Sequence, residues 1–182
     1  MALNDIASEL LLLHGLTGAA YVSKLKEIAA RRKFHPLVDN PCIFTVGGEG
    51  DADYPYLLGA AKKAVEHGYQ VYIMPNPHGQ RTADFIFVRR NVYKLFDLKT
   101  ISGKNIVEAQ LLSSVGQSNR ALLNMTSDYN PSMLARGIKR YFERNDEALE
   151  VLIFKGKKAI SVTRDLTLSA DFYRIFMRRY VK

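Results

Sequence analysis

The chain has 182 residues, of which 47% are hydrophobic and 24% are charged, values typical of a soluble globular protein with its own core. Its one cysteine, Cys42, excludes an internal disulfide framework and a zinc site built from cysteines. The longest apolar run near the N-terminus, Leu10 to Leu13, is too short to cross a bilayer and lacks the features of a signal peptide, so we expect a cytoplasmic protein.

The net charge of +8 is concentrated in the second part of the chain. Residues 1–68 hold 7 Lys/Arg and 8 Asp/Glu, a balance of −1, whereas residues 69–182 hold 19 and 10, a balance of +9. Such a field suits a polyanionic partner, because each phosphate that is neutralised releases condensed counterions. The charge favours contact with nucleic acid, although surplus lysine and arginine can also serve only to keep a surface solvated.

Helical patterns dominate the first 68 residues. Apolar spacing and end signals predict helices at residues 4–13, 19–33 and 53–67. Asn4 is a capping residue for the first, and Pro55 and Gly68 mark the start and the end of the third. The intervening segment 35–53 is rich in proline and glycine and is typical of a loop, with a short strand at 42–46.

After Gly68 the apolar pattern changes to a period of two. It predicts strands at 70–74, 83–89, 91–101, 120–126, 150–154 and 158–163, with helices at 105–115, 131–144 and 170–180. Turn residues predict hairpins at Arg90-Asn91 and at Lys155-Gly156-Lys157. Strands and helices in this mixed order indicate an α/β (α+β) fold, a single mixed central sheet flanked by helices. We expect residues 1–50 to form an N-terminal helical extension and residues 51–182 the α/β domain.

Two aspartates and a lysine on neighbouring predicted strands are the candidate chemical centre. Alternation places Asp97 and Lys99 on one face of their strand, and the hairpin can bring Asp84 beside Asp97. Two facing carboxylates repel unless a cation or a proton lies between them. A divalent ion, Mg²⁺ or Mn²⁺, would suit Asp84 and Asp97 as ligands and could activate water. Lys99 could orient that water or neutralise the charge that builds on a phosphoryl group.

The spacing Asp84…Asp97-Leu98-Lys99 resembles the motif of the PD-(D/E)XK nuclease superfamily, whose restriction-endonuclease-like core has the order αβββαβ. A wider resemblance lies in the stretches 67–72 (HGYQVY), 82–86 (TADFI), 96–100 (FDLKT) and 117–124 (QSNRALLN). These are similar to the C-terminal nuclease domains of contact-dependent growth-inhibition toxins and of phage-associated polymorphic toxins. The resemblance covers roughly residues 54–126. The usual proline before the first acid is absent, and Asp97 stands where glutamate is usual.

The resemblance implies a bacterial, toxin-like nuclease acting on tRNA or DNA, with an immunity protein as a partner. It implies that a helix-borne acid completes the metal site; Glu66 is one candidate and Glu49 another. Such domains include a second, metal-independent RNase type related to barnase, colicin D and RelE. In that type lysine, threonine, histidine and glutamine stabilise the scissile phosphate, which points to Lys99, Thr100, His78 and Gln117 here.

Further residues are candidates for nucleic-acid contact. His78 and Arg81 lie in a glycine-containing turn, and Arg136, Lys139 and Arg140 recur at helical spacing as a positive stripe. Each also has a purely structural interpretation as a solvated surface residue. Likewise Asp84 could cap a turn, and Asp97 with Lys99 could form an exposed pair on an edge strand.

Two hypotheses remain from the sequence. The first is a nuclease centred on Asp84, Asp97 and Lys99. The second is an accessory protein that binds nucleic acid without turnover. The sequence does not indicate an oligomeric state.

Overall fold

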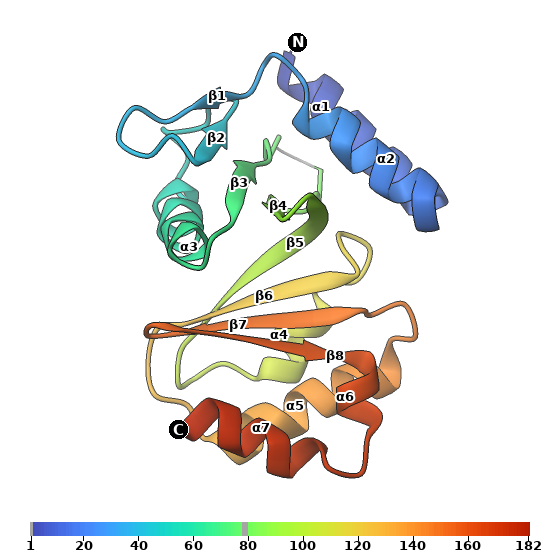
Figure 1. The fold of residues 1–182 in the computed structure, drawn as a ribbon, viewed down its shortest axis with the longest axis vertical. Helices are drawn as coiled ribbons and strands as arrows, with labels where there is room; N and C mark the ends of the chain where they lie inside the picture. Colours follow the sequence, from blue (N-terminus) through green and yellow to red (C-terminus); the bar gives the residue numbers. More distant parts are fainter. Residues whose placement is uncertain (1, 78–79) are drawn as a thin grey trace. The chain divides into compact units, whose positions relative to one another are not determined.

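The computed structural model describes residues 2–77 and 80–182 and divides into two compact units, residues 1–97 and 98–182 (Figure 1). The strands follow the order β1 to β8 in the sheet as they do in the chain, with parallel and antiparallel neighbours. The predicted fold class, a mixed sheet with helices, is confirmed. Within the described residues no helix is long and apolar enough to span a membrane.

Unit 1 combines helices with short strands and the first part of a longer one. Its elements are α1 (Ala2–Leu12), the 3₁₀ helix η1 (Leu13–Gly15), α2 (Gly18–Ala29), β1 (His35–Pro36), β2 (Ile43–Thr45), α3 (Tyr54–Glu66), β3 (Gln70–Ile73), β4 (Phe85–Arg89) and the start of β5 (Val92–Ile101). β2 and β3 are parallel and are connected through α3, whereas β3, β4 and β5 are antiparallel neighbours. Arg90 and Asn91 have φ of 51° and 60°, which is the conformation of a two-residue type I′ hairpin turn.

The two faces of the unit 1 sheet carry different helices. α1 and α2 cover one face, where Ile6, Leu10 and Ile28 join the buried cluster that contains Ile86 and Leu95. The opposite face carries aromatic rings in contact with one another, from Tyr69 and Phe85 to Phe87 and Phe96. α3 contacts β2 and β3.

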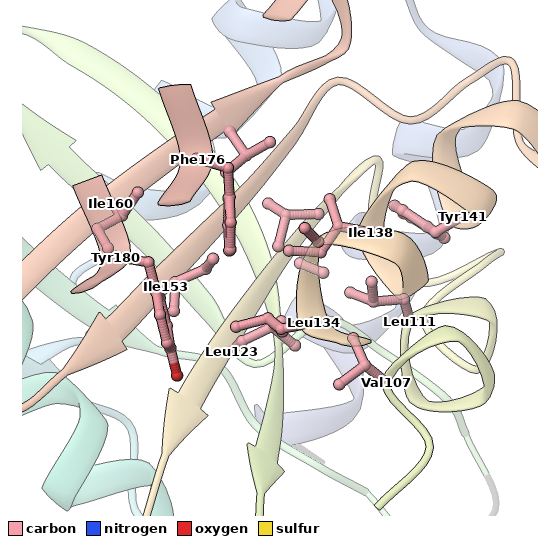
Figure 2. Close-up of a cluster of buried hydrophobic side chains, with 14 of the residues drawn as sticks. Val107, Leu111, Leu123, Leu134, Ile138, Tyr141, Ile153, Ile160, Phe176 and Tyr180 are labelled. Carbon is pink, nitrogen blue, oxygen red and sulfur yellow. The ribbon is translucent and has the colours of Figure 1, made fainter. Parts of the chain in front are cut away.

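Unit 2 packs helices around a separate core (Figure 2). Its elements after β5 are α4 (Val107–Leu112), β6 (Arg120–Met125), α5 (Pro131–Arg144), β7 (Glu150–Lys155), β8 (Lys158–Thr163), α6 (Arg164–Leu168) and α7 (Phe172–Val181). β6 and β7 are parallel, and β7 and β8 form the predicted hairpin. Leu123 and Ile153 from the strands meet Leu134 and Ile138 of α5 and Phe176 of α7.

Several predicted boundaries are wrong, for local reasons. α2 ends at Ala29 rather than at residue 33, and Arg31 and Lys33 beyond it reach the carboxylates of Glu9 and Asp5 on α1. α4 covers only Val107–Leu112 instead of 105–115, and at its C-terminal end the Ser113 hydroxyl donates to the carbonyl of Gln110 in competition with the helical hydrogen bonds. β1 and α6 were not predicted, since two and five residues are too few to show a period.

Candidate functional site

Asp84 lies one residue before β4, at the point where β4 meets both of its neighbours. Its backbone N–H donates to the carbonyl of Phe96 in β5 at 3.0 Å, while its own carbonyl accepts from the N–H of Met74, just beyond β3, at 2.8 Å. In a regular antiparallel sheet the backbone N–H and C=O groups of one residue bond to the same neighbouring strand. Phe85 is also the register partner of Phe96, so two residues of one strand oppose one of the other, which is a β-bulge. The hairpin therefore brings Asp84 next to the Phe96–Asp97 segment.

Asp97 is a buried carboxylate, with 2% of the residue exposed. Along β5 it alternates with Phe96, so it shares a strand face with Leu95 and, two residues on, with Lys99. Lys99 is half-buried and belongs to unit 2, because the division between the units follows Asp97. The relation of Asp97 to Lys99 is thus that of neighbours on one face of one continuous strand.

The face of β5 that carries Asp97 is the face covered by the N-terminal helices. Leu95, on the same side, packs in the cluster built from α1 and α2. Burial raises the pKa of Tyr72 on β3, which packs against the same cluster, and the neighbouring Tyr93 raises it further. The first 30 residues therefore create an apolar surrounding on the side of the sheet to which Asp97 points.

The structure does not bring Glu66 to the aspartates. Glu66 is the last residue of α3, beside His67, whose carbonyl accepts from Arg89 at the hairpin end of β4. Asp84 lies at the opposite end of the sheet, and the length of β3, roughly 13 Å for four residues, lies between the two ends. Glu49 lies in the glycine-rich loop at the other end of α3, which is the end of the sheet where Asp84 lies.

That loop closes a small cavity of about 50 Å³, which the sequence did not indicate. Asp51, Asp53 and Tyr54 line it together with Met74, whose N–H bonds to Asp84. The Tyr54 hydroxyl is buried and has no hydrogen-bond partner among the described residues. The sequence signal that could have marked this end of the parallel pair β2–β3 is the glycine-rich stretch between a strand and a helix. In the structure Gly47 and Gly48 of this stretch have positive φ.

The remaining unit 1 candidates lie in the segment before β4. Arg81 is exposed, and Thr82 next to it is buried and bonds through its hydroxyl to the carbonyl of Pro75. His78 lies outside the described residues. Among the described residues no group of three or more histidine, cysteine, aspartate or glutamate side chains is arranged to hold a metal. A metal at Asp84 and Asp97 would therefore depend on two protein carboxylates.

Two predicted residues of unit 2 have their own local roles. Thr100 is half-buried and lies on the opposite face of β5 from Lys99. Gln117 follows α4, and its amide nitrogen donates to the carbonyl of Ser113 at 2.9 Å. This bond satisfies one of the backbone carbonyls left free at the end of α4.

The basic residues of the stripe on α5 lie in three different surroundings. Arg140 and Arg144 both reach the carboxylate of Glu108, at 3.5 and 2.7 Å. Lys139 lies over the ring of Tyr173 on α7, 5.4 Å from its centroid. Arg136 is exposed and forms no ion pair among the described residues.

Comparisons with known proteins give one partial similarity. No family model matches the chain, and no curated protein matches it. A chain of a solved structure described as "CdiA-CT/CdiI toxin and immunity complex from Burkholderia pseudomallei" is similar to it, with 17% sequence identity and a TM-score of 0.46. The similarity covers 64% of this chain and 89% of that chain.

Proposed function

We propose that this protein is a nuclease that hydrolyses phosphodiester bonds, with Asp84, Asp97 and Lys99 at its centre. The observation that carries the proposal is the hydrogen bond from Asp84 to Phe96, which brings the first acid to the strand that holds the second acid and the lysine. Alternation then gives Asp97 and Lys99 a common face. Two carboxylates and a lysine that met at this place would supply an ion-binding group and a charge-neutralising group for a phosphate.

Asp84 and Asp97 would hold a divalent cation, Mg²⁺ or Mn²⁺. Two carboxylates are enough for Mg²⁺, because this ion usually keeps several waters and takes its other ligands from substrate phosphates. When bound, the ion supplies Lewis-acid stabilisation and lowers the pKa of a bound water. Lys99 would neutralise the charge that develops on the phosphoryl oxygens. The apolar cover from α1 and α2 limits the access of bulk water on the Asp97 side.

The substrate and partners are part of the same proposal. The basic balance of residues 69–182 supports a nucleic-acid substrate. The sequence resemblance to polymorphic toxin nucleases points to tRNA or DNA as substrate and to an immunity protein as partner.

The test is incubation of the purified protein with tRNA and with plasmid DNA, in Mg²⁺, in Mn²⁺ and in EDTA. We expect cleavage of one of the two substrates in either metal and none in EDTA. Cleavage that persists in EDTA but is lost in Lys99→Ala or Gln117→Ala would replace the metal mechanism with that of a metal-independent RNase. Binding of both substrates without cleavage under any condition would favour the accessory protein instead.

A further inference from the structure

A groove of about 370 Å³ lies in unit 2 between the segment that precedes α4 and the first turns of α5. Its lining includes Lys104, Asn105, Ile106, Asn130, Met133 and Arg136. The volume is in the range of sites for small organic ligands. Of these six residues only Arg136 belongs to the basic stripe predicted from the sequence. The sequence did not predict that the other five would line a common groove.

Two asparagines in the groove are oriented by the backbone. Asn105 Oδ1 accepts from the N–H and the hydroxyl of Ser102, at 2.7 and 3.0 Å. Asn130 Oδ1 accepts from the N–H of Met133 at 3.0 Å, as the cap of α5. Because the amide oxygens are engaged, each side chain presents its –NH₂ group as a hydrogen-bond donor. The lining is therefore rich in donors and suits a ligand rich in acceptors.

The cations of the groove exceed its carboxylates. Neither Lys104 nor Arg136 has an ion-pair partner among the described residues. Arg140, also in the lining, shares Glu108 with Arg144, so two cations face one carboxylate. Asp128 is the other acid of the lining and is exposed. The surplus positive charge favours an anionic ligand.

An apolar surface lies beside these donors. Ile106 and Met133 are 70% and 57% exposed, and both line the groove. Tyr129 donates its hydroxyl to the carbonyl of Asn105 at 2.8 Å, which fixes the segment that carries Ile106. The groove thus joins an apolar contact surface to cations and amide donors, a combination that suits a nucleobase with its phosphates.

We propose that this groove binds one nucleotide of a nucleic-acid strand, with the base against Ile106 and Met133 and the flanking phosphates at Lys104 and Arg136. The proposal rests on the proposed function for its choice of ligand, but it concerns binding and not cleavage. Asn105 and Asn130 would donate to acceptors on the base or the sugar. An acidic peptide would satisfy the cations but would have no flat apolar group for the exposed Ile106 and Met133.

The first test measures binding of a fluorescent 12-nucleotide single-stranded DNA by anisotropy, in EDTA, which removes the metal ion that the proposed cleavage needs. Electrophoresis of the oligonucleotide after the measurement confirms that it is intact. The variant Lys104→Gln/Arg136→Gln should bind about tenfold or more weakly than the parent, because two phosphate contacts are lost. Its plot of log affinity against log salt should be shallower by about 0.7 for each lost contact. The control Arg32→Gln/Lys157→Gln removes the same charge at exposed positions elsewhere. Equal affinity of the two double variants would overturn the proposal.

The second test separates a nucleotide from a bare anion. Ile106→Ser should weaken binding of the oligonucleotide several-fold but leave binding of inorganic polyphosphate unchanged, whereas Leu168→Ser, at another exposed apolar residue, should affect neither. Equal loss for both ligands, or no loss for the oligonucleotide, would reject the nucleotide assignment, as would equally tight binding of a glutamate-rich peptide. A parent protein that binds through the groove but never cleaves would refute the nuclease and leave this inference standing.

Discussion

Asp84 and Phe96 are joined by a backbone hydrogen bond of 3.0 Å, which places the first candidate acid at the strand position next to the second. The bond belongs to a bulge, so the position of the Asp84 backbone is set by main-chain contacts to both neighbouring strands. The carboxylate itself plays no part in these two contacts. The variant Asp84→Asn therefore leaves both main-chain bonds in place.

From this arrangement we expect Asp84→Asn and Asp97→Asn each to abolish phosphodiester cleavage while the protein still unfolds cooperatively. Each change removes one of the two negative charges that are proposed to attract a divalent ion. Cleavage assays and thermal denaturation on the same preparations check this. Asp39→Asn, at an exposed position of unit 1, is the control and should retain full activity. Full activity in either site variant would remove that residue from the proposed centre.

Alanine substitutions at two helical glycines, Gly137 in α5 and Gly59 in α3, test how closely α4 and α5 approach each other. A Cβ added at Gly137 would lie 3.2 Å from Val107 Cβ and 3.3 Å from the backbone N of Glu108, and neither atom can move by a rotamer change. A Cβ at Gly59 in α3 would meet nothing within 4 Å. We therefore expect Gly59→Ala to stabilise the protein by about 0.5–1 kcal/mol through helix propensity. Gly137→Ala should destabilise it by about 1 kcal/mol or more, since overpacking outweighs that gain.

Urea denaturation of both glycine variants measures these free energies of unfolding. If Gly137→Ala were as stabilising as Gly59→Ala, the close approach of α4 to α5 would be wrong. The groove described above depends on this contact, because α4 and α5 hold its two sides.

The ion pair between Asp5 of α1 and Lys33, which follows α2, should respond to acid. Lys33 Nζ lies 2.9 Å from Asp5, and this hydrogen bond and charge hold the pKa of Asp5 below its ordinary value of 3.8. A carboxyl with a lowered pKa in the folded state contributes its stability above the unfolded-state pKa and loses it as the pH falls through the folded-state pKa. The Tm difference between the parent and Asp5→Asn should thus be constant from pH 7 to pH 5 and shrink below about pH 3.8. A difference that grows in acid would contradict this pairing.

Local sequence pattern predicted most strands and most helices of this fold, because the signals for these elements are contained within a few residues. The turn at Arg90-Asn91 and the strands on either side of it are an example, and they bring Asp84 toward Asp97. The bulge at Asp84 was not predictable, because it arises from hydrogen bonds to residues ten or more positions away.

The surroundings of the candidate site were not predicted either, because they depend on contacts between residues that are distant in the sequence. Alternation shows that Asp97 and Lys99 share a strand face, but not that α1 and α2 cover that face beside Leu95. The separation of Glu66 from the two aspartates follows from the parallel pairing of β2 and β3, because this pairing puts the two ends of α3 at opposite ends of the sheet. No local pattern reveals that pairing.

The role of Lys99 can be separated from that of basic charge in general by using its own strand. Lys94 and Lys99 are both half-buried residues of β5, but an odd number of positions separates them, so they lie on opposite faces. Lys99→Ala should lower kcat about 10²-fold or more, the scale of losing one group that stabilises charge in the transition state, with a smaller change in KM. Lys94→Ala removes the same charge from the same strand and should change kcat little, because its side chain lies on the face away from Asp97. Steady-state cleavage kinetics of the two variants at one salt concentration make the comparison. Equal losses in kcat would mean that β5 contributes only a general positive field, and Lys99 would then have no specific place in the reaction.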